Sequence, residues 1–176
     1  AGRIVAATAN ALGTTGAITL NDANTGTSNT SLYLQGETTF ARDITVANLG
    51  SGTVTLGASS IKVSSTYPLA YFSGALTLNR ATTLYNGDVN SDGLRFTGVI
   101  SGSGDITVDG VASAALGGGN TRVSFTQASN NTNTGNVTVT GTGRLQLGAG
   151  SGAADMIYDN ATVTVTAGGK FVLAKG

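Results

Sequence analysis

The chain has no cysteine, histidine or tryptophan, and its 176 residues include a single proline. Without cysteine, no disulfide can hold the fold and no thiolate can act as a nucleophile. Without histidine, the commonest general base is missing and a serine hydrolase triad cannot be assembled. We therefore predict that the protein is not an enzyme.

Charged residues are also scarce, with nine Lys and Arg balanced by nine Asp and Glu to give a net charge of zero. Nucleic-acid-binding domains concentrate basic residues, so we expect no nucleic-acid partner. The stretch of residues 44–61, which carries no charge, is rich in Gly, Ser and Thr, unlike a helix in lipid. We expect no membrane span.

Small and polar residues dominate the amino-acid composition. Gly, Ser, Thr and Asn contribute 27, 15, 28 and 14 residues, which together make 84 of the 176. Such a composition can indicate disorder, but disorder usually combines low hydrophobicity with high net charge. Here Val, Ile and Leu recur regularly, and β-branched residues favour strands. The composition therefore predicts an all-β fold.

A three-residue pattern, apolar-Thr-apolar, recurs along the chain. Period-two alternation places both apolar side chains of such a strand on one face and Thr on the other. Each copy is followed within a few residues by the turn formers Gly, Asn, Asp or Ser. The pattern occurs at residues 18–20, 44–46, 54–56, 76–78, 106–108, 137–139 and 163–165.

Three longer stretches, residues 106–116, 137–147 and 163–173, can be aligned with one another. The last two are offset by 26 residues, and each carries a basic residue, Arg144 or Lys170, directly after a glycine. A repeat of this length built from short strands predicts a solenoid in which each copy is one coil.

One strand per coil, starting at residues 18, 44, 76, 106, 137 and 163, gives spacings of 26, 32, 30, 31 and 26 residues. We therefore predict a parallel β-helix of about six coils, forming a single domain over residues 1–176 with an irregular insertion around 66–93. An antiparallel β-sandwich also has short alternating strands. The solenoid is preferred because Asn86-Gly87 is the only hairpin pair of the Asn-Gly type, and because the aligned copies preserve the order of strands over a whole coil.

Three segments resemble the autotransporter-associated β-strand repeat family: residues 96–108 (FTGVISGSGDITV), residues 131–148 (with NTNTGNVTV and GRLQLG), and residues 10–20 (NALG followed by GAITL). The segments occur in the family's order. The resemblance implies a large secreted or surface-anchored bacterial protein built on a right-handed parallel β-helix. We accordingly expect an extracellular or cell-surface location.

Asp88, Asn90 and Asp92, followed by Gly93, match the first half of a calcium-binding loop. Oxygen ligands at alternate positions can converge on a hard cation while glycine permits the turn. Val99 stands where the loop would need a bidentate Glu, so a polar turn without an ion is the alternative. Calcium is the only ion that the sequence suggests, and we expect no other cofactor.

Other acidic and aromatic residues have structural interpretations. Asp105 and Asp109 flank one strand on the same face, but aspartates at strand ends commonly accept hydrogen bonds from turn amides. The phenylalanines fall at inward or strand-end positions, which predicts core packing. Tyr67, Tyr71 and Tyr85 are candidates for an exposed sugar-stacking patch, with loop packing as the alternative.

The two ends of the sequence resemble the same half-repeat, since residues 2–6 match residues 143–147 and 169–173. Either the rod continues in a longer chain, or the last coil of one copy docks on the first coil of the next. We expect the second, with Arg3, Arg144 and Lys170 in a common column. The predicted contact residues are Gly2, Arg3, Ile4, Val5, Lys170, Phe171, Val172 and Leu173.

These features together predict a structural role. We expect a module of an extracellular bacterial filament or surface fibre that polymerises with copies of itself, head to tail. The alternative is an adhesin passenger segment that binds glycans or host and matrix surfaces through its loops.

Overall fold

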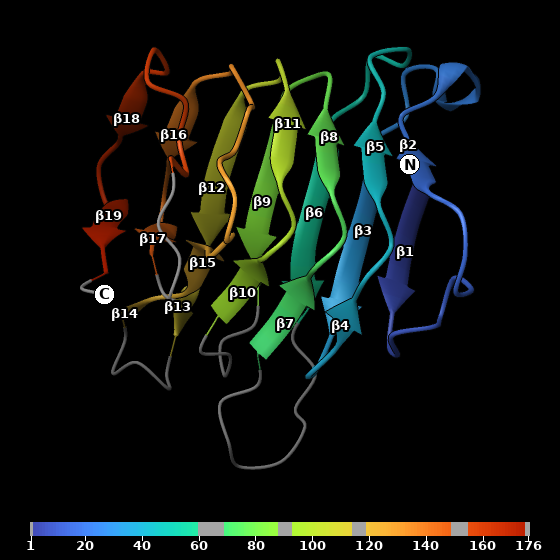
Figure 1. The fold of residues 1–176 in the computed structure, drawn as a ribbon, viewed down its shortest axis with the longest axis horizontal. Coiled ribbons are helices and arrows are strands. Elements are labelled where there is room, and N and C mark those ends of the chain that lie inside the picture. The colour runs from blue at the N-terminus through green and yellow to red at the C-terminus, as the bar shows by residue number, and fades with distance from the viewer. Residues whose placement is uncertain (1, 60–68, 88–92, 114–118, 149–154, 175–176) are drawn as a thin grey trace.

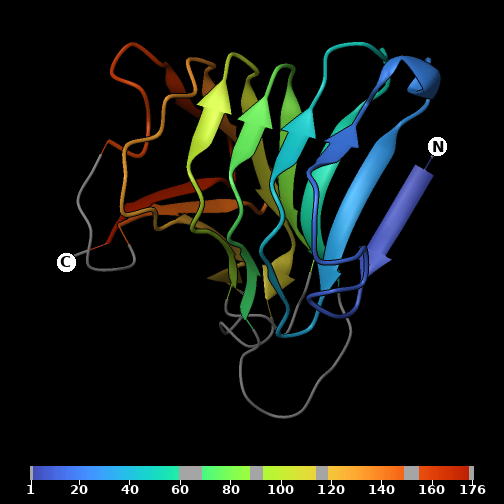
Figure 2. The same ribbon diagram turned by 45° about the vertical axis from the view of Figure 1, so that its right-hand side comes forward.

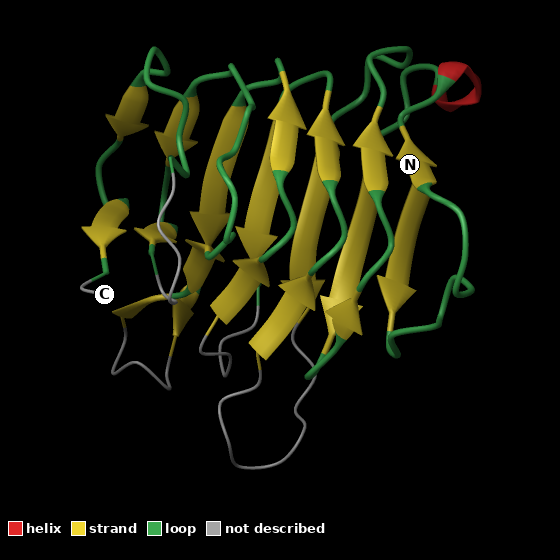
Figure 3. Cartoon of the chain, viewed as in Figure 1, coloured by secondary structure: helices red, strands yellow, loops and turns green. Residues whose placement is uncertain are grey.

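The computed structural model describes residues 2–59, 69–87, 93–113, 119–148 and 155–174. The chain winds into a parallel β-solenoid of about six turns, with three sheets running along its length (Figure 1). The solenoid prediction is confirmed, and the sandwich alternative is wrong because neighbouring strands of all three long sheets are parallel. The described residues contain no α-helix, only a 3-10 turn at Ala23–Thr25 (Figure 3).

The three long sheets are named here A, B and C. Among the described residues, sheet A has seven strands, sheet C has six and sheet B has four. In spatial order, sheet A contains β1 (Gly2–Ala6), β3 (Thr30–Gln35), β6 (Val54–Ser59), β9 (Thr82–Asn86), β12 (Ile106–Gly110), β16 (Val137–Val139) and β18 (Val163–Val165). Sheet C contains β4 (Thr39–Phe40), β7 (Leu69–Phe72), β10 (Gly93–Phe96), β15 (Arg122–Phe125), β17 (Arg144–Leu147) and β19 (Lys170–Leu173). Sheet B contains β2 (Ile18–Leu20), β5 (Ile44–Val46), β8 (Leu76–Leu78) and β11 (Ile100–Gly102).

Each complete coil visits the sheets in the order A, C, B, as β3, β4 and β5 do before the chain returns to sheet A at β6. Figure 1 shows the strands of sheets A and B pointing in opposite directions across the interior, with sheet C below them. The two termini lie at opposite ends of the rod, which the turned view of Figure 2 also shows.

Alternation along each strand divides sheet A into inward and outward columns. One inward column runs through the strands in direct register as Ile4, Leu32, Leu56, Leu84, Val108, Val139 and Val165. The neighbouring outward column consists of Arg3, Ser31, Thr55, Thr83, Thr107, Thr138 and Thr164. The predicted faces of the apolar-Thr-apolar strands are therefore confirmed.

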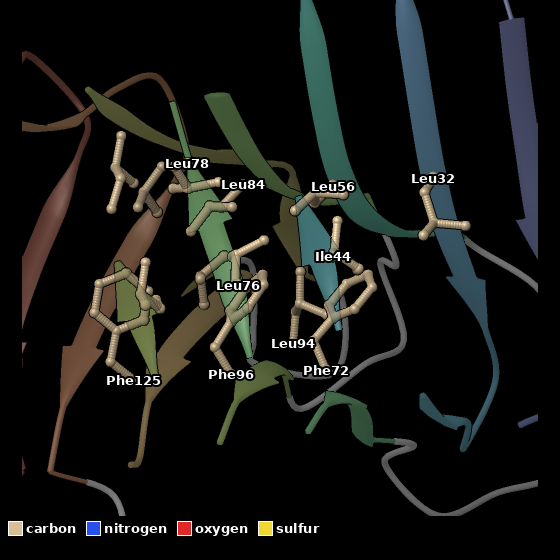
Figure 4. Close-up of a cluster of buried hydrophobic side chains, with 14 of the residues drawn as sticks. Leu32, Ile44, Leu56, Phe72, Leu76, Leu78, Leu84, Leu94, Phe96 and Phe125 are labelled. Carbon is tan, nitrogen blue, oxygen red and sulfur yellow. The ribbon is translucent and has the colours of Figure 1, made fainter. Parts of the chain in front are cut away.

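The core is a continuous apolar cluster enclosed by the three sheets, and Figure 4 shows its central side chains directed into the interior. Sheet C contributes an inward column of aromatic rings, Phe40, Phe72, Phe96 and Phe125, all of them buried. The predicted core packing of these phenylalanines is confirmed.

The prediction that the six chosen strands are equivalent, one in each coil, is wrong because they come from two different sheets. The strands that begin at Ile18, Ile44 and Leu76 belong to sheet B, whereas those at Ile106, Val137 and Val163 belong to sheet A. The physical reason is that the same apolar-Thr-apolar pattern suits any sheet with one buried face. The 26-residue offset is correct, because Val137 pairs with Val163 and Arg144 pairs with Lys170.

The alignment of residues 114–116 with Leu145–Leu147 is also wrong. The strand that pairs with Leu145–Leu147 is Val123–Phe125 of β15, and residues 114–118 lie outside the described residues. Two short antiparallel strands, β13 (Ala112–Ser113) and β14 (Gly119–Asn120), separate β12 from β15. This hairpin displaces the repeat along the sequence.

Within the predicted irregular region, residues 66–93, the described part contains β7, β8 and β9 in register with their neighbours. Residues 66–68 and 88–92 lie outside the described residues. The right-handed sense that the family resemblance implies stays a prediction.

Two glycines at the corners allow adjacent coils to approach closely. A Cβ at position 98 would lie 1.9 Å from the carbonyl oxygen of Gly74, and one at position 104 would lie 2.0 Å from that of Arg80. Because real Cβ atoms do not approach an oxygen this closely, only glycine fits at these corners without a backbone shift. The close approach keeps successive turns stacked.

Candidate functional site

The side chains of the inward column of sheet A are buried in the middle of the rod and exposed at its two ends. Leu32, Leu56, Leu84, Val108 and Val139 have no exposed surface. By contrast, Ile4 at one end is 39% exposed and Val165 at the other end is 45% exposed. These end residues have the same inward orientation as the buried ones but lack a coil on one side. Side chains that continue the apolar core are therefore exposed at both ends of the rod.

At the end formed by β1, the four predicted contact residues do not share one face. Ile4 is in the inward column, while Arg3 and Val5 alternate to the outer face. The guanidinium carbon of Arg3 lies 4.5 Å from the centroid of the Tyr33 ring, which holds that side chain against the outer surface. The backbone N–H of Gly2 donates to the Asn29 carbonyl at 2.8 Å.

At the other end, the predicted residues Lys170, Phe171, Val172 and Leu173 form β19 in sheet C. Phe171 pairs with the buried Leu145 and is 37% exposed, and Leu173 is 72% exposed. Both residues continue inward columns of sheet C beyond the last neighbour. The structure thus places an open apolar edge at this end as well.

The predicted common column of Arg3, Arg144 and Lys170 is wrong. Arg144 and Lys170 are paired in sheet C, but Arg3 lies on β1 in sheet A. The similar sequences of residues 2–6 and 143–147 arise because short strands in both sheets alternate in the same way. The strand at the C-terminal end that shares a sheet with β1 is β18.

Sequence reasoning missed two end residues, Val163 and Val165 of β18, which are 37% and 45% exposed. A signal for them was present. The 26-residue offset from Val137 and Val139 already placed these valines in the last copy of a core column. We define the C-terminal end surface as Val163, Val165, Phe171 and Leu173, and the N-terminal end surface as β1 with Ile4.

The candidate calcium ligands Asp88, Asn90 and Asp92 lie outside the described residues, so the calcium site stays a prediction. Among the residues that the structure does describe, no group of three or more His, Cys, Asp or Glu is placed to hold a metal ion.

The acidic residues at the start of strands cap the backbone of the next coil. Asp43 Oδ1 accepts a hydrogen bond from the Ala75 N–H at 2.8 Å, and Asp105 Oδ1 accepts one from the Asn136 N–H at 2.8 Å. Asn136 Oδ1 in turn accepts from the Thr162 N–H at 2.9 Å. Asp109 Oδ1 has a separate partner, the Gly110 N–H. The interpretation of Asp105 as an acceptor for a turn amide is confirmed.

A surface pocket of about 370 Å³ lies on the outer face of sheet A, lined in part by Arg3, Tyr33 and Tyr85. The two tyrosine rings meet edge to face, with centroids 6.4 Å apart, across Gly57, which lies between them in register. Burial, and after it the charge of Asp109, raises the pKa of Tyr85 above its ordinary value of 10.0. The rings contact each other, so they do not offer two parallel faces for a sugar.

The three tyrosines predicted as one patch do not form one. Tyr85 is on sheet A, Tyr71 is on sheet C beside Arg95, and Tyr67 lies outside the described residues.

None of the helical structure that is described is long and apolar enough to cross a membrane. Comparison of the chain with protein-family models, with curated proteins and with solved structures gives no match.

Proposed function

We propose that this chain is a structural module of an extracellular bacterial filament or surface fibre, in which copies associate end to end through their exposed coils. The observation that carries the proposal is the burial along the inward column of sheet A. Its five central members are fully buried, and only Ile4 and Val165 at the ends are exposed. In the proposed filament, a second copy contributes a neighbour of the same kind to each of these exposed side chains.

The geometry of the two ends suits this contact. β18 and β1 are the opposite edges of one parallel sheet, so β18 of one copy and β1 of the next can pair in the direction that the sheet already has. Continued in register, Val165 would face Ile4 and Thr164 would face Arg3. Unpaired edge strands readily add a further strand. A head-to-tail contact of this kind forms an open filament, because it does not close on itself.

The apolar area at both ends favours association. Burial of apolar surface contributes about 25 cal/mol per Å², and the end surfaces expose large aliphatic and aromatic side chains. The outward columns of Thr and Ser are polar and leave the sides of the rod in water. The distribution of apolar groups therefore supports association through the ends rather than the sides.

The extracellular location and the bacterial origin are supported by the resemblance to autotransporter-associated β-strand repeats. The resembling residues include 96–108, which run from the last residue of β10 through β11 into the first part of β12. The resemblance also implies a right-handed coil. We propose membership of this repeat family on these motifs and on the solenoid fold.

The test is the state of the purified chain as its concentration rises. Light scattering after size-exclusion chromatography is expected to show growing particle mass, and negative-stain electron microscopy is expected to show unbranched filaments one rod wide. A Val165→Lys variant places an ammonium group on the apolar end and is expected to abolish growth. The control is Thr138→Lys, which adds the same charge to the outer face of the neighbouring strand, β16, and should leave assembly intact.

A chain that stays monomeric at high concentration overturns the proposal. Equal loss of assembly in Val165→Lys and Thr138→Lys also overturns it, because the ends would then have no special role. A monomer that binds neutral glycans on an array would support the adhesin alternative instead.

A further inference from the structure

The outer face of sheet A carries one hydroxyl side chain on each of six consecutive strands, β3 to β18. In direct register along the rod, these are Ser31, Thr55, Thr83, Thr107, Thr138 and Thr164. We call these six residues the hydroxyl column. Arg3 on β1 precedes Ser31 and ends the column at the N-terminal side. From β3 to β18 the column is therefore an uncharged row along one side of the rod.

Strand pairing fixes the spacing of the hydroxyl column. Neighbouring strands in a sheet are about 4.8 Å apart, so six members extend over about 24 Å. Each member pairs directly with the next, and no bulge shifts the row. Threonine is β-branched, which restricts its χ1 angle and fixes the orientation of its hydroxyl and methyl groups. The column is thus a regular one-dimensional array of like groups.

The hydroxyl groups of the column are free to bind water. Among the described residues, none of the six makes a side-chain hydrogen bond to another protein group, and their oxygen atoms are not buried. Sheet B differs in this respect, because Thr77 Oγ1 and Ser101 Oγ in its outward column form a hydrogen bond of 3.2 Å with each other. The hydroxyl column of sheet A therefore presents its polar groups to the solvent.

We propose that the hydroxyl column binds the surface of an ice crystal. Ice presents straight rows of water oxygens whose repeat is close to the spacing of paired strands. Each coil can therefore place one hydroxyl on the row and its methyl group in the hollow beside it. A single hydrogen bond exchanged with water contributes little, so binding needs many contacts in register. A column that is already ordered loses little conformational freedom when it makes them.

The last two coils widen the array. Thr140 and Thr166 follow Thr138 and Thr164 by two residues, so alternation gives them the same outward direction at a distance of about 6.7 Å along the strand. In the coils before them, this neighbouring outward column consists of Tyr33, Gly57, Tyr85 and Asp109. The hydroxyl column is therefore the feature that all six strands share.

The composition of the column disfavours other partners. Nucleic acids are bound through basic residues, and the column has none. Protein interfaces depend on anchors such as Trp, Tyr and Arg, which are also absent from the column. The site is on the side of the rod, so the proposal does not depend on association through the ends.

The test measures the melting and freezing temperatures of a single ice crystal in a solution of the purified chain. Bound protein is expected to hold the freezing temperature below the melting temperature, to give the crystal facets, and to enrich the chain in slowly growing ice. Thr107→Lys places a long charged side chain near the middle of the column. This variant is expected to lose the gap between the two temperatures, because the crystal can no longer lie against the row.

The matched control is Thr45→Lys, which makes the same change at a half-buried threonine on the outer face of sheet B and should leave the gap unchanged. Circular dichroism checks that both variants fold, and Thr83→Lys replaces Thr107→Lys if that variant does not. Exclusion of the wild-type chain from ice, or equal losses in the sheet A and sheet B variants, overturns the proposal. Binding to crystalline chitin that Thr107→Lys abolishes, with no effect on ice, overturns the assignment of ice as the partner.

Discussion

Phe72 and Phe96 stack almost parallel, with ring centroids 5.1 Å apart and an angle of 14° between the ring planes. They occupy the same position in two successive coils, β7 and β10, and pair directly in register. Phe40 and Phe125 extend the row at both ends with edge-to-face contacts. The row joins four coils through one kind of side chain, so each ring depends on the coil before it and the coil after it.

Replacement of Phe96 by Ala is expected to lower the free energy of unfolding by about 3–5 kcal/mol, because it leaves a cavity between two rings. The matched control is Phe171→Ala at the open end, where the ring is 37% exposed and the loss should be smaller. Urea denaturation of the dilute monomer, followed by circular dichroism, measures both values. Equal losses would contradict the view that stacking between coils provides the stability.

Gly104→Ala is expected to destabilise the rod by about 1–3 kcal/mol, since the new methyl group would overlap the Arg80 carbonyl and force the corner apart. Its neighbour Ser103 is exposed, so Ser103→Ala should change the stability by less than about 0.5 kcal/mol. Thermal unfolding of the two variants distinguishes them. A Gly104→Ala protein as stable as wild type would show that the corners are looser than the structure indicates.

Asp105→Ala is expected to lower the free energy of unfolding by about 1 kcal/mol, because the Asn136 N–H loses its acceptor. Asp105→Asn retains an oxygen in the same place and should recover most of the loss. Urea midpoints for the pair separate the effect of the hydrogen bond from that of the charge. If the Asp105→Asn and Asp105→Ala variants are equally destabilised, the negative charge rather than the hydrogen bond stabilises the protein.

Stability is expected to fall at alkaline pH because of Tyr85. Burial first, and then the charge of Asp109, raises the pKa of its phenol in the folded state above 10.0. The native state therefore keeps the proton that the unfolded state loses. The stabilisation is complete below pH 10 and is lost as pH rises through the folded-state pKa.

Difference absorption of tyrosinate between wild type and Tyr85→Phe follows this ionisation. Asp109→Asn should move the pKa of Tyr85 part of the way back towards 10.0, since burial is the larger cause. A pKa that does not respond to Asp109→Asn would rule out the charge contribution.

The fold could be predicted from the sequence because the alternation within strands and the repeat between coils are both visible in the order of the residues. The pairs Val137 with Val163 and Arg144 with Lys170 follow directly from a 26-residue offset. The pattern shows which face of a strand is buried but not which of three sheets contains it. For that reason, strands of sheets A and B were merged into one column, and β1 was matched to a strand of sheet C.

The candidate sites were harder to predict, because exposure at an end depends on neighbours rather than on sequence. Val165 and Val139 have the same residue type and the same strand pattern, yet one is 45% exposed and the other is fully buried. The pairing of two arginines on sheet C could not be predicted for a related reason. Arg122 and Arg144 are 22 positions apart in a chain with no net charge, and only the register places them side by side.

The β13–β14 hairpin is inserted between β12 and β15, yet β12 still pairs in register with β9 and β16 on its two sides. A turn can therefore contain more residues without a shift between the strands that stack on it. We expect a peptide inserted between β13 and β14 to leave the register of sheet A unchanged. The spacing of the coils is thus set by the paired strands and not by the number of residues in each turn.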